Sequence, residues 1–414
     1  MASSAPSGYR AVLTHVDSKG GFTKAELLRR AAHRSRLRAA TTLSGHSTTS
    51  SSSVSSPRLF SGQAEYLMEL AIGTPPVPFI ALADTGSDLT WTQCQPCKLC
   101  FPQDTPIYDT SASSSFSPVA CSSATCLPIW SRNCSSTPVC TYRYAYGDGA
   151  YSTGILGTET ITFGSASTSS AHHGIAFGCG ADNGGASYNS TGTVGLGRGT
   201  LSLVAQLGVG KFSYCLTDFF NSSLGSPFLF GTLGDSAGDA AQVESTPLLQ
   251  SPQIPSRYFV SLEGISLGDA RLPIPNDTFA LRADGSGGMI VDSGTIFTVL
   301  EETAFRVVVS HVADVLGQPV VNASSLDAPC FPAPAGERPM PDMVLHFAGG
   351  ADMRLHRDNY MYFNEEDSSF CLSISGTTPA STSVLGNFQQ QNIQMLFDIT
   401  VGQMSFLPTD CSKL

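Results

Sequence analysis

The chain has 414 residues, only 13% of them charged, and a formal net charge of −11 at pH 7. This length exceeds one comfortable hydrophobic core and predicts two domains of about 150 to 200 residues. The acidic balance argues against nucleic acid or an anionic membrane as partner, because both need a basic face, and no apolar run approaches the roughly 18 residues of a membrane-spanning helix.

The first part of the chain differs in charge from the rest. Up to Arg58 it holds nine Lys or Arg against two Asp or Glu, a balance of +7, and the remainder carries −18. We interpret residues 1–60 as a basic arm that clamps electrostatically onto an acidic body; the alternative is a basic tail for nucleic acid or heparin. Residues 41–57 are rich in Ser and Thr and predict an exposed, cleavable linker.

The arm also contains the start signal of one helix. Thr23-Lys24-Ala25-Glu26 fits a capping box, and Phe22 with Leu27 fits a hydrophobic staple. A helix is therefore expected from Thr23 to near Leu37.

Short apolar runs broken by Gly and Pro make the rest of the chain β-rich by prediction. We expect an N-terminal lobe over residues 61–240 and a C-terminal lobe over residues 241–414, joined by a Gly- and Ala-rich linker near residues 233–245. The expected strands are Tyr66–Ile72, Pro78–Ala83, Gly154–Phe163, Gly174–Phe177, Tyr258–Ile265 and Asn392–Asp398, with one amphipathic helix near Glu302–Leu316.

Twelve cysteines, an even number, point to an oxidising secretory route. Seven of them lie in residues 94–140, which we interpret as a stapled surface insertion. The spacing Cys94-x-x-Cys97-x-x-Cys100 is also compatible with a metal or iron–sulfur site, but a disulfide knot is the favoured reading. Glycosylation sequons accompany the cysteines at Asn133, Asn189, Asn221, Asn276 and Asn322.

The two ends of the chain give conflicting addresses. The N-terminus lacks the apolar region of a signal peptide, so we infer that such a segment was removed or replaced. Ser412-Lys413-Leu414 matches a peroxisomal signal. The cysteines favour the secretory pathway.

Two stretches repeat one pattern 208 positions apart. Phe79 to Ser87 is an apolar run that ends in Asp84-Thr85-Gly86-Ser87, and Met289 to Thr295 is an apolar run that ends in Asp292-Ser293-Gly294-Thr295. Two carboxylates within hydrogen-bonding distance share one proton, so one acts as a base and the other as an acid. Such a pair can activate a water for amide hydrolysis without a covalent intermediate.

The neighbours of the two aspartates have expected supporting roles. Ser87 and Thr295 can donate to the outer carboxylate oxygens and hold the two groups coplanar. Thr85 and Ser293 can tie the two loops together beneath them. A single Asp-Thr-Gly is a common turn; the repetition of the whole pattern favours a catalytic pair.

With these motifs the chain resembles the pepsin-type aspartic proteases, and within them the nepenthesin group of plant secreted proteases. The resemblance covers nearly the whole chain and includes Trp91, the flap-like Tyr144-Ala145-Tyr146-Gly147-Asp148-Gly149, and the apolar-Gly pairs Val194-Gly195 and Leu385-Gly386. It implies an all-β, mostly antiparallel, bilobal fold with a few short helices. It also implies that the basic arm is a prosegment and that the cysteine-rich block is the insertion typical of the group.

The resemblance further implies roles for individual residues. Tyr146, with Gly147, Asp148 and Gly149, forms a flap over the cleft, and its hydroxyl is directed to Trp91. Ile296 lies beside the second aspartate in the substrate site. The alternative for Tyr146 is an aromatic residue that only packs in a hairpin. The group's pattern of disulfides implies the pairs Cys94–Cys97, Cys100–Cys179, Cys121–Cys140, Cys126–Cys134, Cys215–Cys411 and Cys330–Cys371.

Three residues depart from the group's pattern. Ile296 stands where many relatives have Thr or Ser, Thr193 replaces an aliphatic residue before Val194, and Ala150 follows the flap where Ser is common. We expect an altered subsite preference and intact catalysis.

Two other motifs do not predict a binding site. Gly195-Leu196-Gly197-Arg198-Gly199 lacks the Lys-Ser/Thr of a phosphate loop, and His172-His173 is interpreted as a solvated loop, so no metal and no cofactor are predicted. The rival functions are a pepsin-like binding protein, such as the plant xylanase inhibitors that have lost the acids, and a receptor-like or adhesive glycoprotein.

The sequence thus predicts an aspartic endopeptidase that is active in acid and in which Asp84 and Asp292 are the catalytic residues. It is expected to be made as a monomeric zymogen and to cleave peptides between bulky apolar residues. Its partners are protein or peptide substrates and its own prosegment.

Overall fold

The computed structural model describes most of the chain beyond the N-terminal linker. The described residues are 8–31, 34, 65–129, 131–134, 138–146, 149–164, 169–185, 190–221, 223–235, 242–322, 328–333 and 339–414. The predicted linker of residues 41–57 lies outside them.

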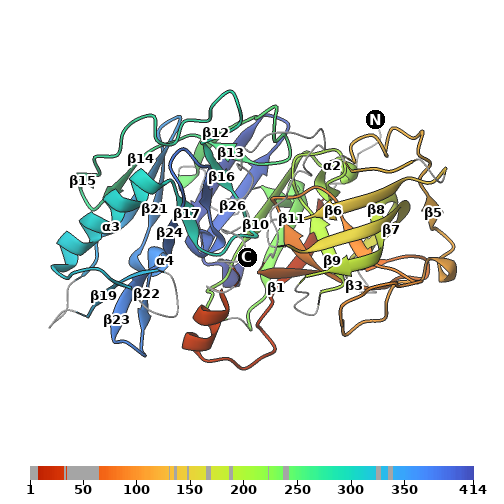
Figure 1. Ribbon diagram of the computed structural model, residues 1–414, viewed down its shortest axis with the longest axis horizontal. Coiled ribbons are helices and arrows are strands. Elements are labelled where there is room, and N and C mark those ends of the chain that lie inside the picture. The colour runs from red at the N-terminus through yellow and green to blue at the C-terminus, as the bar shows by residue number, and fades with distance from the viewer. Residues whose placement is uncertain are drawn as a thin grey trace, which may run out of the picture.

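An antiparallel layer joins the two halves of the molecule (Figure 1). Its strands lie in the order β2, β1, β11, β10, β26, β27, β12, so strands from the start, the middle and the end of the chain pair in one layer. The bounds are β1 Gly8–His15, β2 Tyr66–Ile72, β10 Lys211–Cys215, β11 Ser226–Gly231, β12 Glu244–Leu249, β26 Ile393–Asp398 and β27 Gln403–Pro408.

The first half extends this layer through a long antiparallel ribbon. Strands β7 and β8 pair along most of their length, and β6 and β5 pair with the other edge of β7. Strand β9 lies between β3 and β4, parallel to the first and antiparallel to the second. The bounds are β3 Val77–Asp84, β4 Trp91–Gln93, β5 Ser117–Pro118, β6 Thr141–Ala145, β7 Tyr151–Phe163, β8 Ser170–Gly184 and β9 Gly192–Gly195.

The second half repeats that arrangement. Strand β25 lies parallel to β16 and bridges antiparallel to β17, as β9 does to β3 and β4. Two four-stranded sheets are added to it. The bounds are β13 Phe259–Val260, β14 Leu262–Leu267, β15 Ala270–Arg271, β16 Met289–Val291, β17 Thr298–Leu300, β18 Val321–Asn322, β19 Pro329–Pro332, β20 Met343–Phe347, β21 Ala351–Leu355, β22 Met361–Asn364, β23 Ser369–Leu372, β24 Ile374–Gly376 and β25 Ser383–Leu385.

Helices are few and short, which confirms the predicted mostly β fold with a few helices. The amphipathic helix expected near Glu302–Leu316 is α3 with those bounds, its N-terminus capped by Glu301 and its C-terminus by Gly317. None of the described helices has both the length and the apolar character needed to cross a membrane. Besides α3, the described helices are residues 24–31, α2 Leu203–Leu207 and α4 Arg357–Tyr360, and the 3₁₀ turns are Thr110–Ala112, Thr232–Gly234, Asn387–Gln390 and Cys411–Lys413.

The basic arm is built into the fold. Strand β1 fills the position between β11 and β2 and buries Ala11 and Leu13 in the main core. After a turn, residues 24–31 form the arm helix at the lower edge of the molecule (Figure 1). The capping box is present, because Thr23 N donates to Glu26 Oε2 (2.8 Å) and Glu26 N donates to Thr23 Oγ1 (3.3 Å). The predicted extension of the helix to Leu37 runs beyond the described residues.

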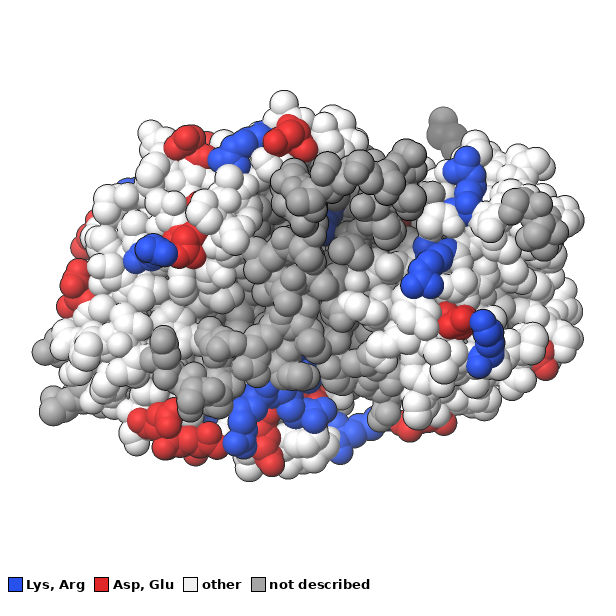
Figure 2. All heavy atoms as spheres, viewed as in Figure 1, with Lys and Arg blue, Asp and Glu red and all other residues white. Residues whose placement is uncertain are grey.

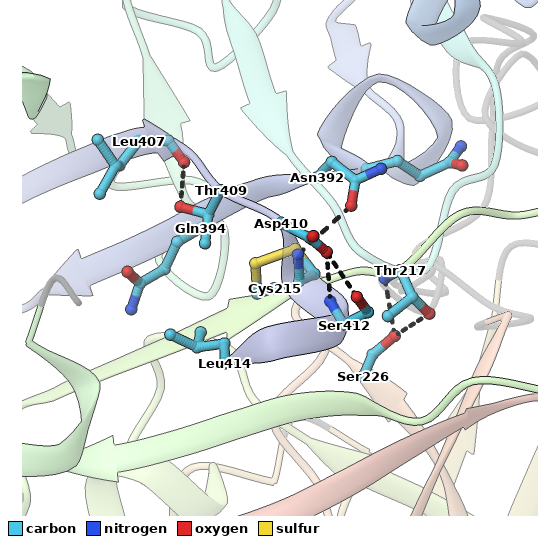
Figure 3. The surroundings of a disulfide bond; sticks show 12 residues. Cys215, Thr217, Ser226, Asn392, Gln394, Leu407, Thr409, Asp410, Ser412 and Leu414 are labelled. Atoms are coloured by element: carbon cyan, nitrogen blue, oxygen red, sulfur yellow. Dashed lines mark hydrogen bonds between the residues drawn. A yellow bond between two sulfur atoms is a disulfide. The ribbon is translucent and has the colours of Figure 1, made fainter. Parts of the chain in front are cut away.

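Two of the six expected disulfides are confirmed. Cys215–Cys411 ties the end of β10 to the C-terminal 3₁₀ turn, where the Cys411 amide also donates to Asn392 Oδ1 (Figure 3). Cys330–Cys371 joins residues that are direct partners on β19 and β23.

The other four expected pairings are wrong. The observed bonds are Cys94–Cys179, Cys97–Cys100, Cys121–Cys134 and Cys126–Cys140, in place of Cys94–Cys97, Cys100–Cys179, Cys121–Cys140 and Cys126–Cys134.

The strand register explains the first exchange. Strand β4 runs parallel to β8 with Thr92 opposite Cys179, so Cys94, which directly follows β4, lies 5.3 Å from Cys179 between Cα atoms. Cys97 and Cys100 are then left to pair with each other across a tight loop.

Burial explains the second exchange. Cys126 and Cys140 are both fully buried in one apolar cluster, whereas Cys134 is exposed and Cys121 is half-buried. The two inner cysteines pair with each other, and so do the two outer ones.

Candidate active site

Both predicted aspartates lie at the ends of inner strands in matching environments. Asp84 ends β3 and is paired with Gly195 of β9, and Asp292 directly follows β16, whose Val291 is paired with Leu385 of β25. Both side chains are almost completely buried. An apolar strand therefore carries each carboxylate to the point where a turn begins.

The two turns bind their carboxylates in the same way. In the first, Gly86 N donates to Asp84 Oδ1 (3.0 Å) and Ser87 Oγ donates to Asp84 Oδ2 (2.5 Å). In the second, Gly294 N donates to Asp292 Oδ1 (2.9 Å) and Thr295 Oγ1 donates to Asp292 Oδ2 (2.8 Å). Each carboxylate thus has one oxygen held by the backbone and the other by a hydroxyl.

The two turns are also bonded to each other. Ser293 N donates to Thr85 Oγ1 (2.9 Å), and the Thr85 hydroxyl donates to Ser293 Oγ (3.2 Å). These bonds join residues 208 positions apart, so the structure brings the two repeated motifs together as the sequence analysis expected of Thr85 and Ser293.

A glycine faces each turn at close range. A Cβ atom on Gly195 would lie 2.2 Å from the carbonyl carbon of Asp88, and one on Gly386 would lie 2.4 Å from the carbonyl oxygen of Ile296. Asp88 and Ile296 each come four residues after the aspartate of their half. The apolar-Gly pairs of the sequence are therefore the places where one backbone passes another without room for a side chain.

Sequence reasoning missed a second pair of supporting residues. Thr90 Oγ1 accepts a hydrogen bond from Gly195 N (3.2 Å), and Thr298 Oγ1 accepts one from Gly386 N (3.0 Å). Both threonines stand six residues after their aspartate, so an alignment of the two motifs beyond the first four positions would have found them.

The residues that follow the two turns differ. Asp88 Oδ1 accepts from Gly199 N (2.9 Å), and its carboxylate is so enclosed by Gly197 and Gly199 that a Cβ on either would collide with it. Burial raises the pKa of Asp88 to about 6, against the opposing effect of the Gly199 N–H. The run of alternating glycines is thus a cradle for a carboxylate of this chain.

Ile296, the counterpart of Asp88, is 2% exposed and belongs to an aromatic cluster under the arm helix. Leu27, Leu28 and Ala31 of the arm helix complete this cluster from the other side. The body contributes Phe219, Phe220, Phe297, Tyr362 and Phe388.

The expected flap tyrosine contacts its expected partner. Trp91 Nε1 donates to the Tyr146 hydroxyl (2.7 Å), and Tyr146 N donates to Ala150 O (2.8 Å) across the tip. Burial is the main reason that the pKa of Tyr146 is raised, and the charge of Asp84 adds to it. Gly149 has φ +86°, a conformation that favours glycine; Gly147 and Asp148 lie outside the described residues.

A cluster of buried ionic groups fastens the arm to the body. The Arg34 guanidinium binds the carboxylates of Asp17 (2.8 Å) and Glu65, and His15 Nε2 lies 3.4 Å from Glu65 Oε2. All four side chains are at most 3% exposed. Because Arg34 occupies the carboxylates, this group of potential metal ligands is an ion-pair network in the structure.

The exposed surface around the arm helix carries charges of both signs (Figure 2). Arg29 pairs with Glu366 (3.0 Å), and Arg30 pairs with Asp17 of the arm itself (2.6 Å). Lys24 lies over the Phe220 ring. The arm is therefore held by strand pairing and apolar packing as well as by charge, which is more than the predicted electrostatic clamp.

The remaining predicted sites are distributed over the surface. Asn133, Asn221 and Asn276 are exposed, Asn322 ends β18, and Asn189 lies outside the described residues. The interpretation of His172-His173 as a loop is wrong, because both residues belong to β8 and the His172 ring packs 4.3 Å from that of Tyr9 of the arm.

The chain is similar to known proteins over nearly its whole length. The family described as xylanase inhibitor N-terminal matches residues 66–232, and the one described as xylanase inhibitor C-terminal matches residues 257–408. Aspartic proteinase nepenthesin-1 from Nepenthes gracilis is 43% identical over 412 residues, which cover 98% of this chain and 90% of that protein.

Two solved structures share the fold at low sequence identity. The basic 7S globulin from soybean is 16% identical with a TM-score of 0.69, over 98% of both chains. The aspartic proteinase from Irpex lacteus is 16% identical with a TM-score of 0.59, over 84% of this chain and 95% of that one. The fold is pepsin-like, and the chain belongs to the nepenthesin-like aspartic proteinases.

Proposed function

We propose that this protein is an aspartic endopeptidase in which Asp84 and Asp292 are the catalytic residues. The observation that carries the proposal is the matched binding of the two buried carboxylates in turns that are bonded to each other. A binding protein on this fold has no need of this duplicated arrangement. The name of the similar nepenthesin-1, an aspartic proteinase, supports the same conclusion.

The proposed reaction needs only protons and a water. One ionised carboxylate takes a proton from the water, whose oxygen attacks the peptide carbonyl, while the protonated carboxyl gives its proton to the carbonyl oxygen. The tetrahedral intermediate then collapses as its C–N bond breaks and the nitrogen receives a proton. Bonds from Ser87 and Thr295 keep each carboxylate in one plane through this exchange.

The proposed substrates are peptides with bulky apolar side chains at the scissile bond. The support is apolar packing on both sides: Tyr146 and Trp91 belong to one buried cluster, and Ile296 belongs to the aromatic cluster of the other half. The reaction is proposed to run at acidic pH, since a shared proton requires that one carboxyl stay protonated.

We further propose that residues 1–60 are a prosegment that keeps the enzyme latent, followed by lobes over residues 61–240 and 241–414. The support is that the arm helix covers the cluster that contains Ile296, four residues after Asp292. Acid would weaken the ion pairs between the basic arm and the acidic body, which would loosen the arm and expose the linker to cleavage within about residues 40–64.

A matched pair of arginine variants tests the latency proposal. Arg34→Gln removes the buried cation that bridges Asp17 and Glu65 and leaves Asp17 only its pair with the more exposed Arg30. The loss should cost about 3 kcal/mol or more of arm docking, so activation should begin at higher pH. Arg29→Gln removes only a half-exposed pair and should change little. Identical activation profiles for the two variants and the parent would contradict the role of the buried network.

We propose that this enzyme enters the secretory pathway and is located in the cell wall, the apoplast or the vacuole. Six disulfides among the described residues support an oxidising compartment. The exposed sequons at Asn133, Asn221 and Asn276 are proposed glycosylation sites, and the enzyme is proposed to act as a monomer.

The decisive experiment is proteolysis of denatured globin from about pH 2.5 to 7, with and without pepstatin, by the parent and by Asp292→Asn. We expect acid-active, pepstatin-sensitive hydrolysis that falls by at least about 1,000-fold in the variant. Inactivity of the parent after confirmed loss of the arm would instead favour a non-catalytic binding protein, such as an inhibitor of a glycosidase.

A further inference from the structure

One buried side chain reaches the backbone of the second aspartate turn from behind. Asn387 directly follows Gly386 and is completely buried. Its Nδ2 atom donates to the carbonyl oxygen of Ser293 (2.8 Å), and its backbone N–H donates to the carbonyl oxygen of Thr295 (2.7 Å). A single residue therefore holds the turn that carries Asp292 at two points.

The side-chain bond continues through one peptide group to the catalytic carboxylate. The carbonyl of Ser293 shares that peptide group with the N–H of Gly294, which donates to Asp292 Oδ1 (2.9 Å). A hydrogen bond to a peptide carbonyl polarises the whole group and makes its N–H a stronger donor. Asn387 thus strengthens a bond that stabilises negative charge on Asp292.

The first half has no counterpart of this side-chain contact. Leu196 stands one residue after the close-approach glycine of its half, as Asn387 does in the second half, and an aliphatic side chain cannot donate. In the part of the chain that the structure describes, no group donates to the carbonyl oxygen of Thr85, which is the counterpart of Ser293. The two carboxylates, matched in their direct bonds, differ in this support.

Stability alone does not account for an amide at this position. The Oδ1 atom of Asn387 is buried and accepts no hydrogen bond from the described residues. An unpaired polar atom in the interior destabilises the folded state, whereas a leucine of similar volume, such as Leu196 in the first half, brings no polar atom. The amide is better explained by the action of its Nδ2 atom on the turn.

We propose that Asn387 is a positioning residue of the candidate active site, which polarises the Ser293–Gly294 peptide and so stabilises the ionised carboxylate of Asp292. The kinetic consequence of this role rests on the proposed peptidase function. The effect on the peptide group is a property of the folded chain and can be measured without substrate.

The first test observes the peptide group directly by NMR of the full chain. Labelling serine carbonyls with ¹³C and glycine nitrogens with ¹⁵N selects the signals of Ser-Gly pairs. In Asn387→Leu the carbonyl carbon of Ser293 and the amide nitrogen of Gly294 should both move upfield, because the carbonyl has lost its donor. The Thr85–Gly86 pair, observed with labelled threonine carbonyls, should not move.

The second test measures hydrolysis of a peptide with apolar residues at the scissile bond. The bond acts on a reacting group, so Asn387→Leu should lower kcat about tenfold and change KM by less than about twofold. The acidic limb of the pH profile should move to higher pH, because the pair of carboxylates has lost support for its negative charge. Besides Asp84, the described titratable group that responds to the charge of Asp292 is Tyr214. Burial above all raises its pKa, so it stays neutral in this range.

An aspartate at position 387 should provide a rescue that depends on pH. A protonated carboxyl can donate to the carbonyl of Ser293 as the amide does, whereas an ionised one cannot, and its charge opposes that of Asp292. Asn387→Asp should therefore keep most of the parent's kcat near about pH 3 and fall at least about tenfold below the parent by about pH 6. A purely structural role would give the same ratio at both pH values.

Asn359 offers a matched control in the same half. Its Nδ2 atom also donates to a backbone carbonyl, that of Gln391 (2.9 Å), which is not part of the aspartate turn. Asn359→Leu should lower the melting temperature and leave kcat and the signals of Ser293 and Gly294 unchanged. Parent-like signals in Asn387→Leu, or equal shifts in Asn359→Leu, would overturn the proposal.

Two further outcomes are also decided by the NMR signals. If Asn387→Leu does not fold, the same signals in Asn387→Asp should be parent-like near about pH 3 and shifted upfield near about pH 6, and constant signals would overturn the proposal. If the parent cleaves no peptide, the signals still decide the effect on the peptide group, and only the proposed function fails.

Discussion

The two halves of the molecule bind their aspartates identically but finish the surrounding loop differently. In both, a backbone N–H and a hydroxyl hold the carboxylate, and a threonine six residues on binds the glycine that passes behind. At the fourth residue after the aspartate the halves diverge, since Asp88 lies in a cradle of glycines and Ile296 lies in the aromatic cluster under the arm.

The difference indicates which parts of the duplicated loop the chemistry needs. The groups that donate directly to the carboxylates, and the threonines behind them, are kept in both halves. The fourth residue after the aspartate is free to differ between the halves. In the first half Asp88 contacts a glycine turn of the same half, and in the second Ile296 packs in a cluster that the arm helix completes.

The largest expected loss of stability comes from replacing the glycine that each half places against its aspartate turn. Gly195→Ala and Gly386→Ala each force a Cβ against backbone that cannot move aside, and each should cost about 3 kcal/mol or more in the free energy of unfolding. Denaturant unfolding is the measurement. Gly350→Ala is the control, because Gly350 has φ +81° and open space around it, so its cost should stay near 1 kcal/mol.

A smaller effect should expose an asymmetry in the link between the turns. Thr85→Val removes both bonds to Ser293 and leaves the buried Ser293 N–H unpaired, for a cost of about 2 to 3 kcal/mol. Ser293→Ala loses only the bond between the hydroxyls and should cost about 1 kcal/mol. Thermal unfolding of the two variants compares them directly; equal losses would mean that the link is symmetric in solution.

The smallest effect concerns Asp88 and depends on pH. Folding raises the pKa of Asp88 from 3.8 to about 6. Between these two pH values the carboxyl is protonated in the folded chain and ionised in the unfolded chain. The free energy of unfolding therefore falls as pH rises through this interval. The side chain of Asp88→Asn cannot ionise. The free energy of unfolding of this variant, relative to the parent, should therefore increase by about 1 to 2 kcal/mol between pH 3.5 and 7.

Urea unfolding at those two pH values checks this prediction. Asp284→Asn is the control, since Asp284 is exposed and bonds with Ser286 lower its pKa, so this variant should gain nothing over the same interval. A constant difference between Asp88→Asn and the parent would show that the glycine cradle accommodates the charge without cost.

Much of the site follows from local sequence. The Asp-hydroxyl-Gly-hydroxyl pattern dictates its own hydrogen bonds, because each donor lies two or three residues from its acceptor. The same holds for the Thr23–Glu26 capping box and for α3, whose apolar positions recur with helical spacing.

Features that depend on strand register could not be predicted in the same way. Cys94 pairs with Cys179 because β4 and β8 happen to align there, and the four cysteines concerned allow several pairings of equal merit by spacing. The burial that raises the pKa of Asp88 likewise depends on a turn more than 100 residues away, because Gly197 and Gly199 enclose the carboxylate only when β9 is in place.

The position of β1 has a consequence for how the protein must be produced and matured. A chain that starts at Gly62 presents the edges of β2 and β11 as two open templates, with the holes left by Ala11 and Leu13 between them. Unpaired edges of this kind recruit strands from other molecules and lead to aggregation. If residues 1–60 are removed as proposed, residues 8–15 have to stay as a bound peptide or another segment has to fill their place. A synthetic peptide of those eight residues, Gly8–His15, should rescue the solubility of the shortened chain.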